Sequence, residues 1–168
     1  YNYVGDSILG YKAHMGAGSI TSNVKSDKSL VVVHTQPPIA TGIKKVRPDA
    51  TVYVHAGDGC SYVIGLEETC YAAIRDVPIT MIVVNNGIFG MTGGQLNLAT
   101  TLLGDKTLSS KTGRKKETMG SPSDMLKAIS AFDVEFLARG ALYDAKHIEQ
   151  TKKLIKKGFE NQRDGKGF

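Results

Sequence analysis

Two short polar segments carry the residues best suited to chemistry. Gly57-Asp58-Gly59 and Asn85-Asn86 each follow an apolar run, with one predicted helix and one predicted strand between them. A carboxylate and a carboxamide offer the hard oxygen atoms that Mg²⁺ prefers, and glycines let a backbone approach a diphosphate closely. Either segment alone would be typical of an ordinary turn. Together they predict a site for a metal ion and a phosphorylated cofactor.

Strands and a helix must bring these segments together. The run Thr51 to His55 predicts a strand that ends at Gly57, and apolar residues at a helical period predict a helix over residues 61–75. The uninterrupted apolar run Ile79 to Val84 is typical of a strand buried on both faces of a parallel sheet. The polar segments would then lie at the carboxyl ends of neighbouring strands, where open α/β sheets bind ligands. We therefore expect an α/β fold with an open, mostly parallel sheet and helices on both faces.

The rest of the chain is predicted in less detail. The further predicted elements are a strand Leu30–His34, a helix Ile39–Val46, a long loop 87–120, a helix from Ser121 as cap to Ala131, a strand Val134–Ala138, and a helix from Asp144 as cap to Phe159 with Ile148, Leu154, Ile155 and Phe159 inward. Residues 1–29 show no clear period. A length of 168 residues suits a single domain, 1–168. Because the first residue is not methionine, we expect the sequence to be incomplete at its termini.

Composition excludes several classes of function. The chain is 41% hydrophobic and 22% charged, as is usual for globular proteins. No window approaches the roughly 20 apolar residues of a membrane span, so no membrane association is expected. Nucleic acid is not expected as a partner, because aromatic residues do not interleave with the basic ones. Cys60 and Cys70 would lie about 15 Å apart along a helix, too far for a disulfide, and two thiols indicate the cytoplasm.

The net charge of +5 is concentrated late in the chain. The basic residues concerned are Arg114-Lys115-Lys116 and the lysines 152, 153, 156 and 157. A solvated loop and a solvated helix face are the simpler interpretation. The alternative is a docking surface for an acidic partner protein.

The predicted metal site has three protein ligands. Asp58 and Asn86 would supply side-chain oxygens and Ile88 a backbone carbonyl, and phosphate and water would fill the rest of the Mg²⁺ octahedron. The helix that starts near Ser61 would point its amino end at the same place, which favours an anion. Thr92, Gly93 and Gly94 would offer further donors to the diphosphate. Turn chemistry without a metal is the alternative for Asp58 and Asn86.

The motif from Gly57 to Asn86 resembles the thiamine-diphosphate motif shared by transketolases, pyruvate decarboxylases and 2-oxoacid oxidoreductases. A wider set of segments is similar to the β subunit of 2-oxoacid:ferredoxin oxidoreductases, above all the 2-oxoglutarate and 2-oxoisovalerate members. Those segments are Ala40-Thr41-Gly42-Ile43-Lys44, Ile64-Gly65, the run from Asn85 to Gln95, Ala99-Thr100-Thr101 and Gly104-Asp105-Lys106-Thr107.

The resemblance implies a thiamine-diphosphate-binding fold and a role in the oxidative decarboxylation of a 2-oxo acid to acyl-CoA. It implies ferredoxin as electron acceptor, an α subunit that completes the active site, and further small subunits. It assigns no catalytic residue to this chain. The cofactor-binding residues that it implies are Gly57, Asp58, Gly59, Cys60, Asn86, Thr92, Gly93 and Gly94, with Asp58, Asn86 and Ile88 at Mg²⁺.

The chain departs from this family at its cysteines. Family β subunits usually carry a Cys-x-x-Cys pair and further cysteines that bind a [4Fe–4S] cluster, which takes four thiolates. This chain has two cysteines, and Cys60 stands where the family has an acidic residue. The departure favours, as an alternative, a subunit of a non-oxidative thiamine-diphosphate decarboxylase of the sulfopyruvate or phosphonopyruvate type. A third hypothesis is a non-catalytic assembly subunit, against which the intact Asp58 and Asn86 argue.

Overall fold

The computed structural model describes residues 3–4, 20–21 and 36–168. The chain divides into two compact units, Tyr1–His34 and Thr35–Phe168. In the first unit, strand β1 (Tyr3–Val4) pairs in parallel with β2 (Ile20–Thr21). The predicted strand Leu30–His34 lies outside the described residues. The single domain therefore stays a prediction.

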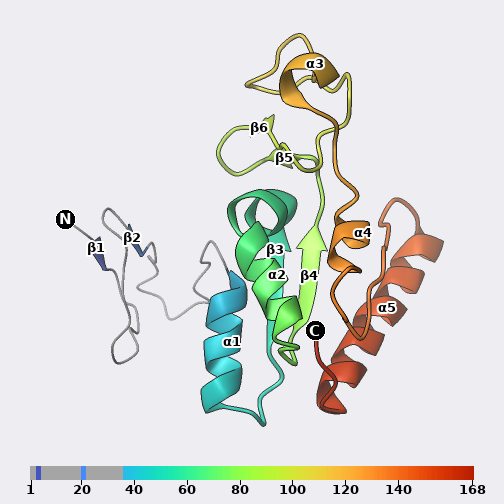
Figure 1. The fold of residues 1–168 in the computed structure, drawn as a ribbon. Coiled ribbons are helices and arrows are strands. Elements are labelled where there is room, and N and C mark those ends of the chain that lie inside the picture. Colours follow the sequence, from blue (N-terminus) through green and yellow to red (C-terminus); the bar gives the residue numbers. More distant parts are fainter. Residues whose placement is uncertain (1–2, 5–19, 22–35) are drawn as a thin grey trace. The chain divides into compact units, whose positions relative to one another are not determined.

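The second unit holds the predicted site and the elements around it (Figure 1). Its elements are α1 (Gln36–Val46), β3 (Tyr53–Gly57), the π-helix η1 (Cys60–Ile64), α2 (Leu66–Ile74), β4 (Thr80–Val84), β5 (Ile88–Phe89), β6 (Gln95–Leu96), α3 (Lys116–Met119), α4 (Met125–Ile129) and α5 (Ala145–Arg163).

Strands β3 and β4 are parallel neighbours, as the sequence predicts. Their register runs from Tyr53 opposite Thr80 to Gly57 opposite Val84, so both strands end at the same edge. The segment between them, η1 followed by α2, makes the crossover that parallel pairing requires. Asp58 and Asn85 therefore leave the sheet side by side. Short strands β5 and β6 follow beyond this edge, where Figure 1 shows them above the end of β4.

Helices cover both faces of β3. Burial alternates along this strand, and Val54 and Ala56 pack into a core cluster with Ala40 of α1 and Ala72 of α2. On the other face, the Tyr53 ring meets Phe159 of α5 edge-on, with ring centroids 5.7 Å apart. Figure 1 shows the same arrangement, with α1 and α2 on one side of the strands and α5 on the other. The predicted open α/β architecture is confirmed.

Burial of β4 is less than predicted. Its first four residues are partly buried and Val84 is exposed. Among the described residues, β4 pairs with β3 alone. The expectation of a strand buried on both faces is wrong, because β4 is at most partly buried along its whole length.

The predicted helix over residues 61–75 is broken at Gly65. The Gly65 N–H bonds to Cys60 O at 2.9 Å, which closes the wider turn of η1, and α2 then begins at Leu66. The buried Thr69 hydroxyl bonds to Ser61 O at 3.0 Å and to Gly65 O at 2.8 Å. These contacts join the two helical pieces, and the bond to Gly65 O adds to the one that this carbonyl accepts from Thr69 N.

Three predictions in the last third of the unit are wrong. Helix α4 starts at Met125 with Asp124 as its cap rather than Ser121, because Ser123 N bonds to Ala99 O and holds the preceding residues extended. Residues 134–138 form no strand; Glu135 N bonds to Phe168 O instead of a neighbouring strand. Helix α5 does begin after Asp144, but Ile148 in its first turns is 39% exposed, and Gln162 near its end is buried.

Gln162 connects α5 by hydrogen bonds to the residue before β3. Its side chain accepts from Val52 N at 2.8 Å and donates to Val52 O at 2.6 Å. We expect Gln162→Leu to lower the free energy of unfolding by about 2 kcal/mol, because the buried Val52 N–H loses its partner and Val52 O keeps only its bond from Thr80 N. Urea denaturation measures this, with Gln150→Leu on the exposed part of the same helix as control. Equal midpoints for the two variants would contradict the role given to Gln162.

The part of the chain that the structure describes contains no helix long and apolar enough to cross a bilayer.

Candidate functional site

Asp58 is the buried centre of the predicted site, with 1% of its surface exposed. It follows β3 directly. Its Oδ2 accepts hydrogen bonds from Gly87 N at 3.0 Å and from the Thr100 hydroxyl. Its Oδ1 is buried and has no hydrogen-bond partner among the residues that the structure describes. The two carboxylate oxygens therefore differ: Oδ2 is held by two hydrogen bonds, and Oδ1 makes none within the described residues.

Asn85 and Asn86 shape the turn that reaches back to Asp58. Asn85 Oδ1 accepts from Gly87 N at 3.1 Å, and Asn86 Oδ1 accepts from Ile88 N at 3.1 Å. Side-chain bonds to a backbone two residues on are typical of Asx turns. Both asparagines are exposed, and a carboxamide oxygen that accepts one bond has a second lone pair to offer. Asn86 therefore keeps a free acceptor position beside the turn.

These residues fit a divalent cation. An anionic oxygen that is buried without a partner is costly, and a cation bound to Asp58 Oδ1 would remove that cost. Mg²⁺ commonly takes one or two carboxylates and fills its other positions with phosphate oxygens and water. Within the described ranges no three His, Cys, Asp or Glu side chains converge. The site suits an ion that arrives with a phosphorylated cofactor.

Two threonines that the sequence did not predict complete the surroundings of Asp58. The Thr100 hydroxyl donates to Asp58 Oδ2, and the Thr101 hydroxyl donates to Gly87 O. Asn97, which is fully buried, turns the chain between β6 and these residues: its Oδ1 accepts from Ala99 N at 2.9 Å and Thr100 N at 3.3 Å. The Ala99-Thr100-Thr101 segment carried the family resemblance, but nothing in it predicted contact with Asp58.

Gly59 lies against the Phe89 ring. A β-carbon at Gly59 would come within 2.4 Å of Phe89 Cε1, so the segment after Asp58 and strand β5 approach each other more closely than a side chain allows. This contact joins the two motifs across the sheet edge. A glycine here is required by space rather than by backbone conformation, since its φ is −64°.

Replacement of Gly59 tests this close approach. We expect Gly59→Ala to lower the free energy of unfolding by about 1–3 kcal/mol, because overpacking pushes the ring or the backbone aside. Adding Phe89→Leu should restore part of the loss. Thermal unfolding of both variants decides the matter, with Gly42→Ala, where a β-carbon would meet nothing within 4 Å, as a space control. Full stability of Gly59→Ala alone would contradict the packing argument.

Hydrogen-bond donors of the glycine-rich loop 90–95 bond to acceptors within or next to the loop. Thr92 is exposed, and its hydroxyl bonds to Gln95 Oε1 at 2.7 Å. Gly93 N bonds to Gly90 O at 3.2 Å, and Gly94 N bonds to Phe89 O at 2.8 Å. A diphosphate would have to displace these bonds to use the predicted donors. None of the described bonds joins this loop to Asp58, so the diphosphate contacts of Thr92, Gly93 and Gly94 stay predictions.

Cys60 begins η1 directly after the Gly-Asp-Gly segment, close to the predicted helix start. Burial, and secondarily the negative charge of Asp58, raise the pKa of its thiol. The pKa of the Tyr62 hydroxyl is also raised, mainly by burial; the positive charge of Arg139 opposes this shift and the negative charge of Asp58 adds to it. A neutral thiol is a poor ligand for a hard cation. Cys60 can therefore touch a cofactor by packing, but oxygen ligands must hold the metal. Both cysteines are thiols, as predicted.

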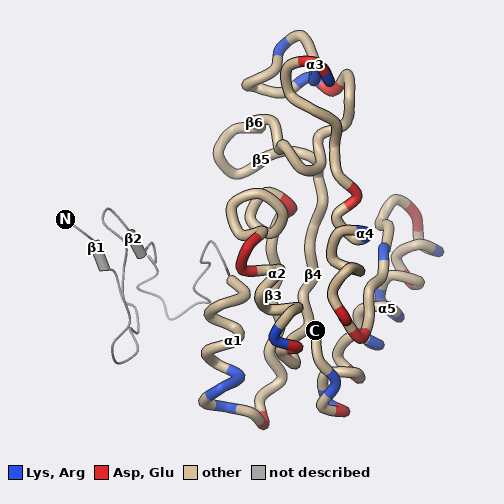
Figure 2. Tube along the Cα trace, in the orientation of Figure 1, with Lys and Arg blue, Asp and Glu red and all other residues tan. Residues whose placement is uncertain are grey.

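Arg114 differs from the solvated basic loop that the sequence predicts. It is 3% exposed, whereas its neighbours Lys115 and Lys116 are exposed. Its guanidinium donates to five backbone carbonyls: Gly120, Asn97, Thr101, Leu98 and Met119. Figure 2 shows basic residues around α3 and along α5, the helix that carries the lysines 152, 153, 156 and 157. Nothing in the sequence separates Arg114 from the cations that follow it.

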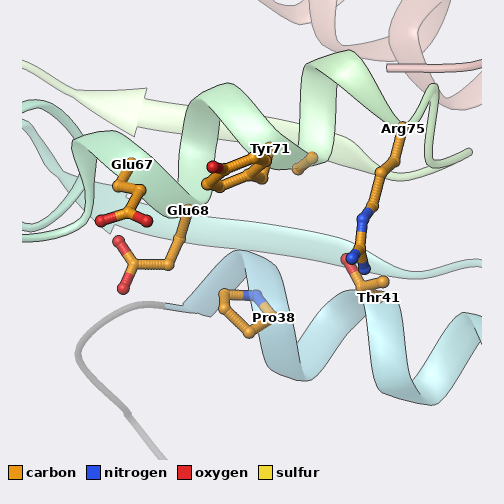
Figure 3. Close-up of a pocket in the computed structure, with 7 residues that line it drawn as sticks. Pro38, Thr41, Glu67, Glu68, Tyr71 and Arg75 are labelled. Atoms are coloured by element: carbon orange, nitrogen blue, oxygen red, sulfur yellow. The ribbon is translucent and has the colours of Figure 1, made fainter.

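A separate hollow lies between α1 and α2 and has a volume of about 310 Å³. It contains none of the predicted site residues. Figure 3 shows Glu67 and Glu68 at one end and Arg75 beside Thr41 at the other. The chemistry that the sequence predicts is thus at the sheet edge around Asp58 and not in this hollow.

Comparison with known proteins identifies the family of this chain. A family model described as the thiamine pyrophosphate enzyme, C-terminal TPP binding domain, matches residues 13–166. The chain belongs to this family. The predicted family resemblance is confirmed.

Two curated relatives of this thiamine pyrophosphate enzyme domain are enzyme subunits. Ketoisovalerate oxidoreductase subunit VorA of Methanothermobacter thermautotrophicus is 40% identical over 142 residues, 83% of this chain and 30% of that protein. The 2-oxoglutarate synthase subunit KorB of Methanocaldococcus jannaschii is 37% identical over 141 residues, 83% of this chain and 48% of that protein. The chain thus spans about a third to a half of the length of these relatives.

A solved structure shares the fold of this domain. It is the 2-oxoglutarate:ferredoxin oxidoreductase from Magnetococcus marinus with 2-oxoglutarate, coenzyme A and succinyl-CoA bound, at 23% identity and a TM-score of 0.67. The match covers 85% of this chain and 42% of that chain. At this identity the likeness establishes the open α/β fold.

Proposed function

We propose that this chain belongs to the β subunit of a 2-oxoacid:ferredoxin oxidoreductase, where it holds thiamine diphosphate through Mg²⁺. The observation that carries the proposal is the state of Asp58. One of its oxygens is fixed by Gly87 and Thr100, and the other is buried and unpaired, in a chain of the thiamine pyrophosphate enzyme family.

Each predicted site residue has a role in this proposal. Asp58 Oδ1, Asn86 Oδ1 and the Ile88 carbonyl would hold the metal. The segment Gly57 to Cys60 and the loop around Thr92, Gly93 and Gly94 would border the diphosphate. The bound cofactor supplies the electron sink for loss of CO₂, while the protein supplies binding and orientation. Burial of Asp58 strengthens its attraction for the cation, since the local dielectric is low.

The whole reaction needs partners that this chain does not contain. We propose an α subunit that completes the active site, coenzyme A as acyl acceptor, and ferredoxin and further small subunits for electron transfer. The substrate is a 2-oxo acid of the 2-oxoglutarate or 2-oxoisovalerate type, in line with the names of the relatives. The cytoplasm is the proposed compartment, because both cysteines are thiols.

A non-oxidative thiamine-diphosphate decarboxylase is the second candidate. The cysteine count favours it, because Cys60 and Cys70 cannot supply the four thiolates of a [4Fe–4S] cluster. In the oxidoreductase, those ligands would have to come from another part of the enzyme.

Cofactor and iron analysis of the natively purified complex separates the candidates. We expect thiamine diphosphate, iron and acid-labile sulfide together, and reduction of a viologen dye that requires both a 2-oxo acid and coenzyme A. Thiamine diphosphate without iron, with CO₂ release that does not need coenzyme A, would favour the non-oxidative decarboxylase. A complex without thiamine diphosphate would overturn both and leave the assembly subunit.

A further inference from the structure

Arg114 is a buried cation whose charge faces carbonyl oxygens. Its Nη1 donates to Thr101 O at 2.6 Å and Asn97 O at 3.5 Å, and its Nη2 donates to Leu98 O at 2.8 Å. None of the ion pairs within the described residues includes it. A buried charge without a counterion is costly. The hydrogen bonds to the carbonyls offset this cost, and the fixed geometry of the guanidinium requires those carbonyls to lie at defined positions around it.

The same side chain joins two stretches that are separate in sequence. Its Nη2 also reaches Met119 O at 3.2 Å, and its Nε reaches Gly120 O at 3.0 Å. The Arg114 backbone is fixed as well, since its N–H bonds to Asp105 O at 3.0 Å and its carbonyl accepts from Gly104 N at 2.9 Å. Arg114 therefore holds the turn at residues 97–101, which β6 precedes, against the end of α3.

That turn carries the two hydroxyls that fix the site. Thr101, whose carbonyl Arg114 binds, donates its hydroxyl to Gly87 O. Thr100, the adjacent residue, donates to Asp58 Oδ2. The guanidinium contacts neither Asp58 nor Gly87, but it bonds to backbone carbonyls of the turn whose hydroxyls hold both. The fork is planar and makes several parallel bonds, which a lysine ammonium cannot copy.

We propose that Arg114 is a positioning residue for the metal and diphosphate site. It holds the 97–101 turn so that Thr100 and Thr101 fix Asp58 Oδ2 and Gly87, and Asp58 Oδ1 then faces the cation. This inference rests on the proposed function and deepens it, because it names a residue outside the site on which Mg²⁺ affinity depends.

The test uses the complete complex and measures thiamine-diphosphate binding while Mg²⁺ is varied. We expect Arg114→Lys to raise the half-saturating Mg²⁺ concentration at least about tenfold, equal to about 1.4 kcal/mol. Binding at saturating Mg²⁺ should change far less. Arg47→Lys, a matched change at a side chain that is 65% exposed, should leave the Mg²⁺ dependence unaltered.

A second variant keeps the inference testable where Arg114→Lys does not fold. Thr100→Val removes the hydroxyl on Asp58 but leaves Arg114 in place, and we expect it to give a shift in Mg²⁺ dependence of similar size. If the complex folds with both substitutions, its half-saturating Mg²⁺ concentration should be at most about twice that of the more affected single variant. The reason is that both residues act through the same contact on Asp58.

The outcomes separate this inference from the proposed function. A folded Arg114→Lys or Thr100→Val complex with the wild-type Mg²⁺ dependence would overturn the positioning role. A wild-type complex that binds thiamine diphosphate without any need for a divalent cation would overturn the proposed metal site itself.

Discussion

Replacement of Asp58 by asparagine is expected to remove Mg²⁺-dependent binding of thiamine diphosphate. The variant keeps the shape of the side chain but loses the negative charge at Oδ1, the buried oxygen for which the described part of the chain offers no hydrogen-bond partner. We expect the dissociation constant of the cofactor at fixed Mg²⁺ to rise at least about a hundredfold, equal to about 2.7 kcal/mol. Isothermal titration calorimetry on the complete complex measures this change.

Asp133→Asn is the matched control for that experiment. Asp133 is exposed, so the same loss of one charge there should leave cofactor affinity within a factor of about two. The Asp58 variant should also lose the difference in affinity between buffers with Mg²⁺ and with a chelator. Retention of that difference would show that the metal is held elsewhere.

Replacement of Gly113 by alanine is expected to destabilise the loop that supports the site. Gly113 has a φ of +91°, and a β-carbon there would lie 2.5 Å from Gly104 O. The Gly104 backbone cannot move away freely, because its N–H bonds to Arg114 O. We expect a loss of about 2–4 kcal/mol in unfolding free energy from the clash and the strained backbone together. Denaturant unfolding of the purified protein gives the value.

Gly104→Ala separates the two causes. Gly104 has a φ of +88°, but a β-carbon there would meet nothing within 4 Å. This variant should carry only the cost of the backbone conformation, about 1 kcal/mol. Equal losses at Gly104 and Gly113 would mean that the backbone conformation alone explains both, and that the close approach of the two glycines is not important.

The centre of the site could be predicted because it depends on regular structure. Apolar runs predict the strands around Val54 and Ile82, and parallel strands end at the same edge of a sheet. Asp58 follows the end of β3 directly and Asn86 follows the end of β4 after one residue, so their placement follows from the pattern. The register from Tyr53 to Gly57 then fixes which polar residues leave the sheet side by side.

The support of the site could not be predicted, because it depends on side-chain bonds within a loop. Thr100, Thr101 and Arg114 lie in the predicted loop 87–120, where no periodic pattern indicates which residue is buried. Arg114 is followed by exposed lysines, and only the five carbonyls around it distinguish it.

The boundaries of elements failed for a related reason. Ser121 and Asp124 are both good helix caps, and the choice between them was made by the bond from Ser123 N to Ala99 O, which is distant in sequence. Residues 134–138 have a sequence typical of a strand, but strands need a partner, and Glu135 N finds the carbonyl of Phe168 instead. Long-range contacts overrode local preference in both cases.

The most direct measurement is the anomalous diffraction of Mn²⁺ in crystals of the complete complex soaked with Mn²⁺ and thiamine diphosphate. We predict a peak about 2.0–2.2 Å from Asp58 Oδ1, with the Asn86 side-chain oxygen and the Ile88 carbonyl among its other ligands, while Asp58 Oδ2 keeps its bonds to Gly87 and Thr100. Bound cofactor with Asp58 Oδ1 remote from the metal would contradict the account.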